Sequence, residues 1–102
     1  MRMLLRLTFP TDRFNEMMKA GKVGPAIQRI LEDTKPEAAW FGSEQDGERG
    51  AVVVVDVPTP ADLPRVTEPW YLALGARVET SVAMTPEEVA GLDMDGLAKT
   101  YG

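Results

Sequence analysis

The chain has 102 residues, which is the size of one domain (residues 1–102), and 44% of them are hydrophobic, enough for a core. Its formal net charge of −5 argues against nucleic acid or an anionic membrane as the main partner. It has no Cys and no His, which excludes disulfides, thiol nucleophiles and the commonest ligands of metals and haem. We therefore expect no metal and no other cofactor. No apolar run is long enough to span a membrane and no signal-peptide pattern opens the chain, so a cytoplasmic protein is expected.

The first part of the sequence predicts a strand and then two helical segments. Residues 1–9 alternate, and one face of this predicted strand is apolar: Met1, Met3, Leu5, Leu7 and Phe9. Pro10 ends the strand, and apolar residues three and four apart predict a helix after it. Pro25 fits the first turn of a second helical segment, which Pro36 ends.

Two further strands follow, with a turn between them. Residues 37–43 predict a strand that places Trp40 and Phe41 on opposite faces. Gln45 to Gly47 form a turn whose Asp-Gly pair indicates a hairpin. Residues 49–57 predict the next strand, in which four consecutive valines suit a pleated sheet.

The last part of the chain predicts more helix and one more strand. A short helix begins near Leu63, Pro69 favours a fresh start, and Gly75 ends that second piece. Residues 76–84 alternate as a fourth strand, with Val78 and Val82 expected to face the helices.

A capping box opens a final helix. Thr85 and Glu88 form the box, and we expect Gly91 and Gly96 to break the helix. Asp93 and Asp95 resemble a short acidic ligand pair, but we expect them to lie in a solvated loop.

This order of elements predicts an α+β fold, the ferredoxin-like βαββαβ arrangement with an added C-terminal helix. Its helices would cover one face of a four-stranded antiparallel sheet, whose central strands are the first and the third. The valine strand is apolar on both sides, however, and such strands are normally covered on both faces. We therefore expect a homodimer in which two sheets face each other as a closed α+β barrel.

Within such a barrel, the second sheet face would line a cavity. If Leu5 and Leu7 face the helices, Arg6 faces the cavity, and Glu79 and Ser81 on the fourth strand point the same way. The Arg6 guanidinium offers a fork of donors to a carboxylate or enolate oxygen. Glu79 is a candidate carboxylate base if the dimer buries it.

Each of these residues also has a purely structural interpretation. Arg6 and Glu79 on adjacent strands could pair with each other, as opposite charges often do across a sheet. Asp56 could orient Arg6 or simply begin the turn after its strand. Trp40 and Tyr71 are candidates for binding an aromatic ligand, but such residues are more often core or interface.

Two arginines, Arg2 and Arg77, lie near strand starts. At these positions we expect both to be solvated.

Several short motifs are spread over most of the chain: Phe9-Pro10, Lys35-Pro36-Glu37-Ala38, Asp46-Gly47 with Arg49-Gly50, Glu68-Pro69-Trp70 and Met84-Thr85-Pro86-Glu87. Together they resemble a small uncharacterised family of the dimeric α+β barrel superfamily. The resemblance implies a ferredoxin-like dimer. That superfamily includes cofactor-free monooxygenases, muconolactone isomerases, polyketide cyclases, haem-degrading enzymes and stress-response proteins. Many of them use histidines that this chain lacks, so no catalytic residue is carried over.

Two functions are therefore open. The first is a small-molecule-binding protein or cofactor-free enzyme (isomerase, cyclase or monooxygenase-like) that holds a hydrophobic or aromatic anion at Arg6 in the barrel. The second is a non-catalytic dimeric interaction or regulatory module, in which the polar residues pair and set the register. Neither function involves nucleic acid or a membrane.

Overall fold

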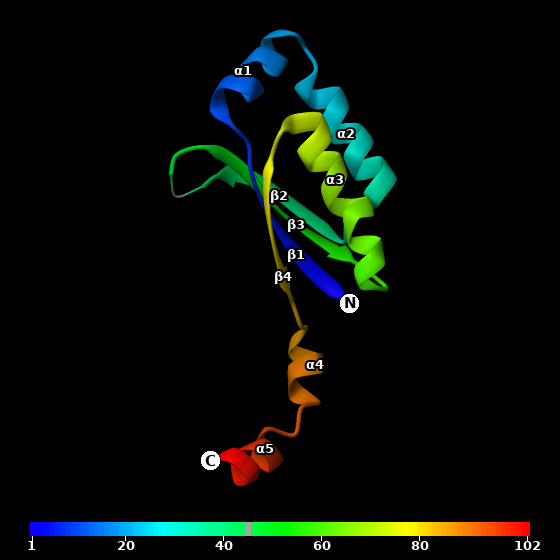
Figure 1. Cartoon of the computed structure of the whole chain (residues 1–102), viewed down its shortest axis with the longest axis vertical. Coiled ribbons are helices and arrows are strands. Elements are labelled where there is room, and N and C mark those ends of the chain that lie inside the picture. The colour runs from blue at the N-terminus through cyan, green and yellow to red at the C-terminus, as the bar shows by residue number, and fades with distance from the viewer. Residues whose placement is uncertain (45) are drawn as a thin grey trace.

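The protein has two layers, a four-stranded antiparallel sheet and a layer of helices, followed by a C-terminal arm (Figure 1). The computed structural model describes residues 1–44 and 46–102. The strands are β1 (Arg2–Thr8), β2 (Ala38–Ser43), β3 (Arg49–Asp56) and β4 (Arg77–Val82). The helices are α1 (Thr11–Lys19), α2 (Val23–Thr34), α3 (Leu63–Leu74), α4 (Pro86–Ala90) and α5 (Met94–Tyr101), and a 3-10 turn (Pro60–Asp62) precedes α3. The predicted α+β class is confirmed.

The strand order is β2-β3-β1-β4, so β1 and β3 are central, as the sequence predicts. Each neighbouring pair is antiparallel. Leu5 lies opposite Val53 on one side and opposite Thr80 on the other. Because directly opposite residues share a face and successive residues alternate, this register assigns every strand residue to one of two faces.

One face of the sheet packs against α1, α2 and α3 and forms the core. Its buried residues are Met3, Leu5, Leu7, Ala51, Val53, Val55 and Val57, which pack with Phe14, Ile30, Val66, Trp70 and Leu74 from the helices. At roughly 25 cal/mol per Å² of buried apolar area, this cluster is the main source of stability. The alternation in β1 and β3 thus places aliphatic side chains where the sequence predicts them.

The opposite face, which we call the open face, has none of these three helices on it. Its residues follow from the register: Arg2, Leu4, Arg6, Thr8, Ala38, Trp40, Gly42, Gly50, Val52, Val54, Asp56, Arg77, Glu79 and Ser81. Val52 and Val54 are half-buried, and the Trp40 side chain is 63% exposed. Apolar and charged side chains therefore share a surface that this chain leaves accessible.

The predicted fresh start at Pro69 is wrong, because α3 is one continuous helix with Pro69 inside it. An internal proline removes one backbone hydrogen bond and costs about 3 kcal/mol. Trp70 and Leu74, which follow it, are both buried in the core, and Thr67 donates a hydrogen bond to the Leu63 carbonyl (3.2 Å). Burial of these side chains outweighs the local preference of proline.

Two apolar residues at strand ends are more exposed than alternation predicts. Met1 precedes β1 and is 51% exposed, while its amino group binds Asp56 (3.1 Å) and the Val57 carbonyl. Asp56 therefore binds the N-terminus instead of orienting Arg6. Val82 ends β4 and is also exposed, because β4 reaches past the helix layer there.

The C-terminal segment differs from its prediction in one respect. The helix breaks at Gly91, but Gly96 lies inside α5. Asp95 lies inside α5 rather than in a loop, whereas Asp93 is exposed in the segment before α5, as predicted. Asp93 is also the N-cap of α5, and its carboxylate accepts a hydrogen bond from the Gly96 amide (3.0 Å). A capping aspartate satisfies an amide that the first helical turn leaves free, which starts a new helix despite the glycine.

The hairpin between β2 and β3 agrees with the turn predicted there in its described part. The Gly47 amide donates to the Glu44 carbonyl (3.0 Å), and the Asp46 carboxylate accepts from the Glu48 amide (3.1 Å). Gly47 has φ +84°, which glycine adopts without strain. Gln45 lies outside the described residues.

Candidate functional site

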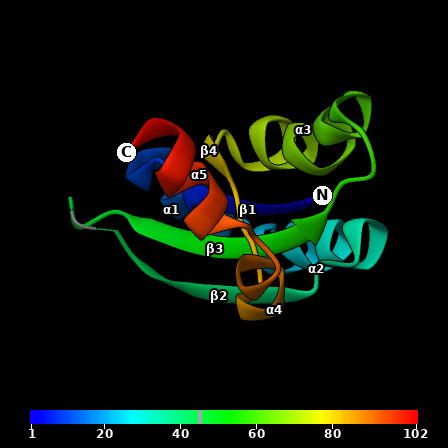
Figure 2. The ribbon, with the colours of Figure 1, turned by 90° about the horizontal axis from the view of Figure 1, so that it is seen from below.

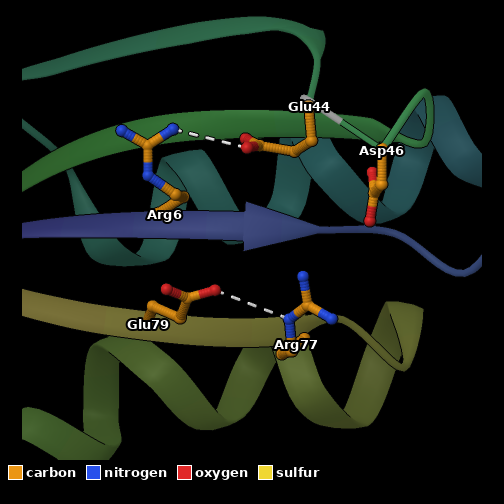
Figure 3. A pocket seen from close by; sticks show the side chains of 5 residues that line it. All are labelled: Arg6, Glu44, Asp46, Arg77 and Glu79. Atoms are coloured by element: carbon orange, nitrogen blue, oxygen red, sulfur yellow. Dashed lines mark hydrogen bonds and ion pairs between the residues drawn. The ribbon is translucent and has the colours of Figure 1, made fainter.

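Arg6 lines a charged pocket on the open face (Figure 3). The pocket has a volume of about 400 Å³ and is lined by Arg6, Glu44, Asp46, Arg77 and Glu79. Figure 3 shows the helices behind the strands, with the side chains on the other side of the sheet. Both arginines offer forked donors that suit a carboxylate or phosphate group.

Glu44 reaches Arg6 from two strands away. Its carboxylate oxygen is 3.3 Å from Nη1 of Arg6, although β3 lies between β2 and β1. The path crosses Gly50, where an added Cβ would be 2.7 Å from Cγ of Glu44 and 2.5 Å from the Leu7 carbonyl oxygen. The missing side chain of Gly50 thus makes room for the Glu44 side chain, which is itself only 15% exposed.

Arg77 and Glu79 form the other side of the pocket. Nε of Arg77 is 3.6 Å from Oε1 of Glu79, and Arg77 also donates to the Thr8 hydroxyl (3.4 Å). Glu79 lies directly opposite Arg6 in the register. In the described chain, however, the ion pairs join Arg6 to Glu44 and Glu79 to Arg77, so the predicted Arg6–Glu79 pair is not the one formed.

An apolar hollow adjoins the charged pocket at Arg6 and Glu44. It has a volume of about 190 Å³, and Trp40 and Val52 provide apolar surface in it. A molecule with an anionic head and an apolar body could therefore place its head at Arg6 and its body along Trp40. Ligand sites commonly combine apolar walls with a few placed polar groups in this way.

The structure brings four of the five predicted site residues onto one face and separates the fifth from them. Trp40, Glu79 and Ser81 all share the open face with Arg6, and Ser81 lies opposite Leu4, next to the charged pocket. Tyr71 lies on α3, and its hydroxyl donates to the Val78 carbonyl (3.4 Å). It belongs to the helix layer and does not reach the pocket.

Sequence reasoning missed Glu44 and Asp46. Both carboxylates come from residues between β2 and β3, and periodicity does not report their contacts. Arg77 is solvated as predicted, with its side chain 63% exposed, and it also lines the pocket. A usable signal was present in the glycine pair of β2 and β3, since Gly42 and Gly50 lie opposite each other on the open face. Paired glycines leave a gap that a neighbouring side chain can fill.

Arg2, which the sequence predicts to be solvated, is held by two ion pairs. Its guanidinium donates to Glu37 and to Glu88, both at 2.9 Å. The hydrogen bond and charge of Glu37, together with the charge of Glu88, raise the pKa of Arg2 above its usual value. Arg2 therefore joins the start of β2 to the first turn of α4.

A larger hollow, about 590 Å³, lies on the helix layer between α2 and α3. Its two charged residues, Arg29 and Asp33, pair with each other across one turn of α2 at 3.7 Å. Such exposed pairs contribute little stability and present no converging donors. The open-face pocket is therefore the stronger candidate site.

No model of a known protein family matches the chain. A search of curated proteins likewise finds no significant match. Among residues 1–44 and 46–102, no three His, Cys, Asp or Glu side chains gather as a metal ion would require. Over the same residues, each helix is too short or too polar to cross a bilayer.

Proposed function

We propose that the protein is a homodimer of ferredoxin-like subunits, of the dimeric α+β barrel type, that binds a small hydrophobic or aromatic anion between its two open faces. One observation carries the proposal: Arg6 lies where the charged pocket meets the apolar hollow of Trp40 and Val52. The strand order with β1 and β3 in the centre supports the ferredoxin-like assignment. The exposed Trp40 and the half-buried Leu4, Val52 and Val54 on the open face support a second copy as its cover.

Glu44 shows how an anion would be recognised. Its carboxylate already occupies a donor of Arg6 at 3.3 Å. A ligand carboxylate that takes the same donor would displace it and exchange one charge-assisted hydrogen bond for another. Glu44 would therefore act as an internal competitor that holds Arg6 in place when no ligand is bound.

Catalysis would require one further step at the same place. Glu79, opposite Arg6, would take a proton from the carbon next to a ligand carbonyl, while Arg6 would stabilise the enolate oxygen. Return of the proton at another carbon would complete an isomerisation. In the single chain, the side chain of Glu79 is 62% exposed, so this step depends on burial by the second copy.

The binding proposal is tested with naphthalene-2-carboxylate as the probe, titrated against the protein and followed by NMR. We expect Arg6→Ala to weaken binding by at least about tenfold and Glu44→Gln to strengthen it severalfold. The matched control is Arg65→Ala, an exposed arginine on α3, which should leave the affinity unchanged. Equal affinity of the wild type and Arg6→Ala would refute the assignment of Arg6.

The proton-transfer step has a separate readout. Incubation of β,γ-unsaturated aryl carboxylates in D₂O would show deuterium entering the ligand with the wild type and none with Glu79→Gln. Binding without exchange would leave the protein as a binding protein.

A second candidate is a non-catalytic dimeric module. The observation that favours it is the internal pairing of both pocket arginines, Arg6 with Glu44 and Arg77 with Glu79. In that case the charges would fix the register between two copies. A dimer that weakens on Arg6→Ala, together with no affinity for the probe in the wild type, would decide for this candidate.

A further inference from the structure

The C-terminal arm, residues 83–102, extends away from the two-layer body (Figure 1). Figure 2 views the molecule from the end that carries the arm, so α4 and α5 are in front. The radius of gyration is 16.9 Å and the longest dimension is 59 Å. A compact domain of about 100 residues has a radius of gyration of about 13 Å. The arm therefore makes the chain more elongated than a compact domain of the same length.

The arm carries apolar side chains that its own chain leaves uncovered. They are between 45% and 83% exposed: Met84, Val89, Leu92, Met94, Leu97 and Tyr101. None of residues 83–102, all within the described range, is buried. Short helices of this length are marginal in water unless an apolar face packs on something, so the arm needs a binding surface.

The start of the arm fixes its direction. The Ala83 amide donates to the Arg2 carbonyl (3.0 Å), and Glu88 closes a capping box with Thr85. Glu88 also accepts from Arg2, which lies on the open face. These contacts hold the first turn of α4 beside the start of β1, and a copy facing the open face would meet the arm as it stands.

We propose that each arm packs its apolar side chains against the body of a second copy, so that two copies exchange arms. The inference rests on the homodimer of the proposed function and adds that the exchanged arms hold its two copies together. Two-fold symmetry makes it self-consistent, because every chain offers one arm and one open face. A stable interface buries about 800 Å² per partner, and an open face joined by an arm offers more apolar contact than the face alone.

Charge argues for this occupant over a membrane surface. Residues 83–102 contain Glu87, Glu88, Asp93 and Asp95 against a single cation, Lys99. Amphipathic helices that bind anionic lipids are rich in Lys and Arg on their polar face. The acidic arm therefore fits a protein surface better than an anionic membrane.

The test uses the full chain with Leu92→Asp and Leu97→Asp, each placed on the exposed side of the arm. The matched control is Leu72→Asp, which makes the same change at a side chain 74% exposed on α3. Sedimentation equilibrium should show dimer dissociation constants raised by at least about tenfold in the arm variants and unchanged in the control. Circular dichroism would check that the body is folded in all three.

The outcomes separate this inference from the proposed function. A wild type that stays monomeric at high micromolar concentration overturns both. A wild-type dimer that tolerates both arm variants overturns the arm exchange and leaves the facing sheets. Sedimentation of a monomeric wild type with phosphatidylcholine–phosphatidylserine vesicles would assign the arm to membranes instead.

Packing of the arm on its own body has a different signature. The chain has no Cys, so Lys99→Cys gives a single labelling site for an acceptor of tryptophan fluorescence. Labelled chains that also carry Trp40→Phe would be mixed with unlabelled wild type. Energy transfer from tryptophan to the label that rises on mixing supports exchange between copies. Energy transfer that is independent of mixing and of protein concentration refutes it.

Discussion

The two faces of the sheet are built from the same strands yet differ in what surrounds them. Val53 is fully buried under the helices, while its neighbour Val52 on the open face is only half-buried. Leu5 and Leu4 differ in the same way along β1. The helix-covered face is aliphatic at its centre, whereas the open face mixes aliphatic residues with charges. This difference indicates that the open face is better suited to binding a partner or ligand than to forming a second hydrophobic core.

Truncating the same residue type on the two faces should give the largest contrast. Leu5→Ala leaves a cavity in the core and should lower the free energy of unfolding by about 2–5 kcal/mol. Leu4→Ala should cost about 1 kcal/mol or less in the isolated chain. Urea unfolding measures both. If a second copy covers the open face, the cost of Leu4→Ala should grow with protein concentration, and a constant cost would speak against that cover.

A glycine pair on the open face gives the next largest effect. Gly50→Ala would force Cβ into the Leu7 carbonyl and the Glu44 side chain, and should destabilise the fold by about 1–3 kcal/mol. Gly42→Ala is the matched control, since its Cβ would have nothing within 4 Å, and it should be neutral or slightly stabilising. Thermal unfolding compares the two. Equal effects would contradict the path of Glu44 over Gly50.

Removing a charge from the open face should affect stability little. The Arg6 side chain is 49% exposed, so its pair with Glu44 is well screened by solvent. Arg6→Leu should change the free energy of unfolding by less than about 1 kcal/mol. A much larger loss would make Arg6 a structural residue, and a small one leaves it available for a ligand.

The smallest effect concerns the anchor of the arm in acid. The hydrogen bonds from the Thr85 backbone and side chain, and then the charge of Arg2, lower the pKa of Glu88 below its ordinary value of 4.5. Because its folded pKa is depressed, Glu88 stabilises α4 above pH 4.5, and this contribution is lost as the pH falls through the lower, folded pKa. NMR titration of the carboxyl group should show its pKa rising toward 4.5 in Thr85→Ala. The rise should be smaller in Arg2→Gln. Thr85→Ala keeps the backbone hydrogen bond, so an unchanged pKa in both variants would refute the contributions of the Thr85 side chain and of Arg2.

Local patterns in the sequence determined most of the elements and the faces of the strands. Alternation in residues 1–9 and 49–57 predicted which side chains enter the core, because a strand turns successive residues to opposite faces. The Thr85–Glu88 capping box began a helix as predicted, since it satisfies amides within one turn. These features depend on residues a few positions apart.

The tertiary structure alone decided the features that join distant segments. Glu44 pairs with Arg6 because its side chain passes Gly50 of β3 to reach β1. Arg2 pairs with Glu88 because β4 ends beside the start of β1. Pro69 stays helical because Trp70 is buried, a gain that local preference does not contain. Periodicity reports which way a side chain points, whereas its partners depend on how strands and helices far apart in sequence pack together.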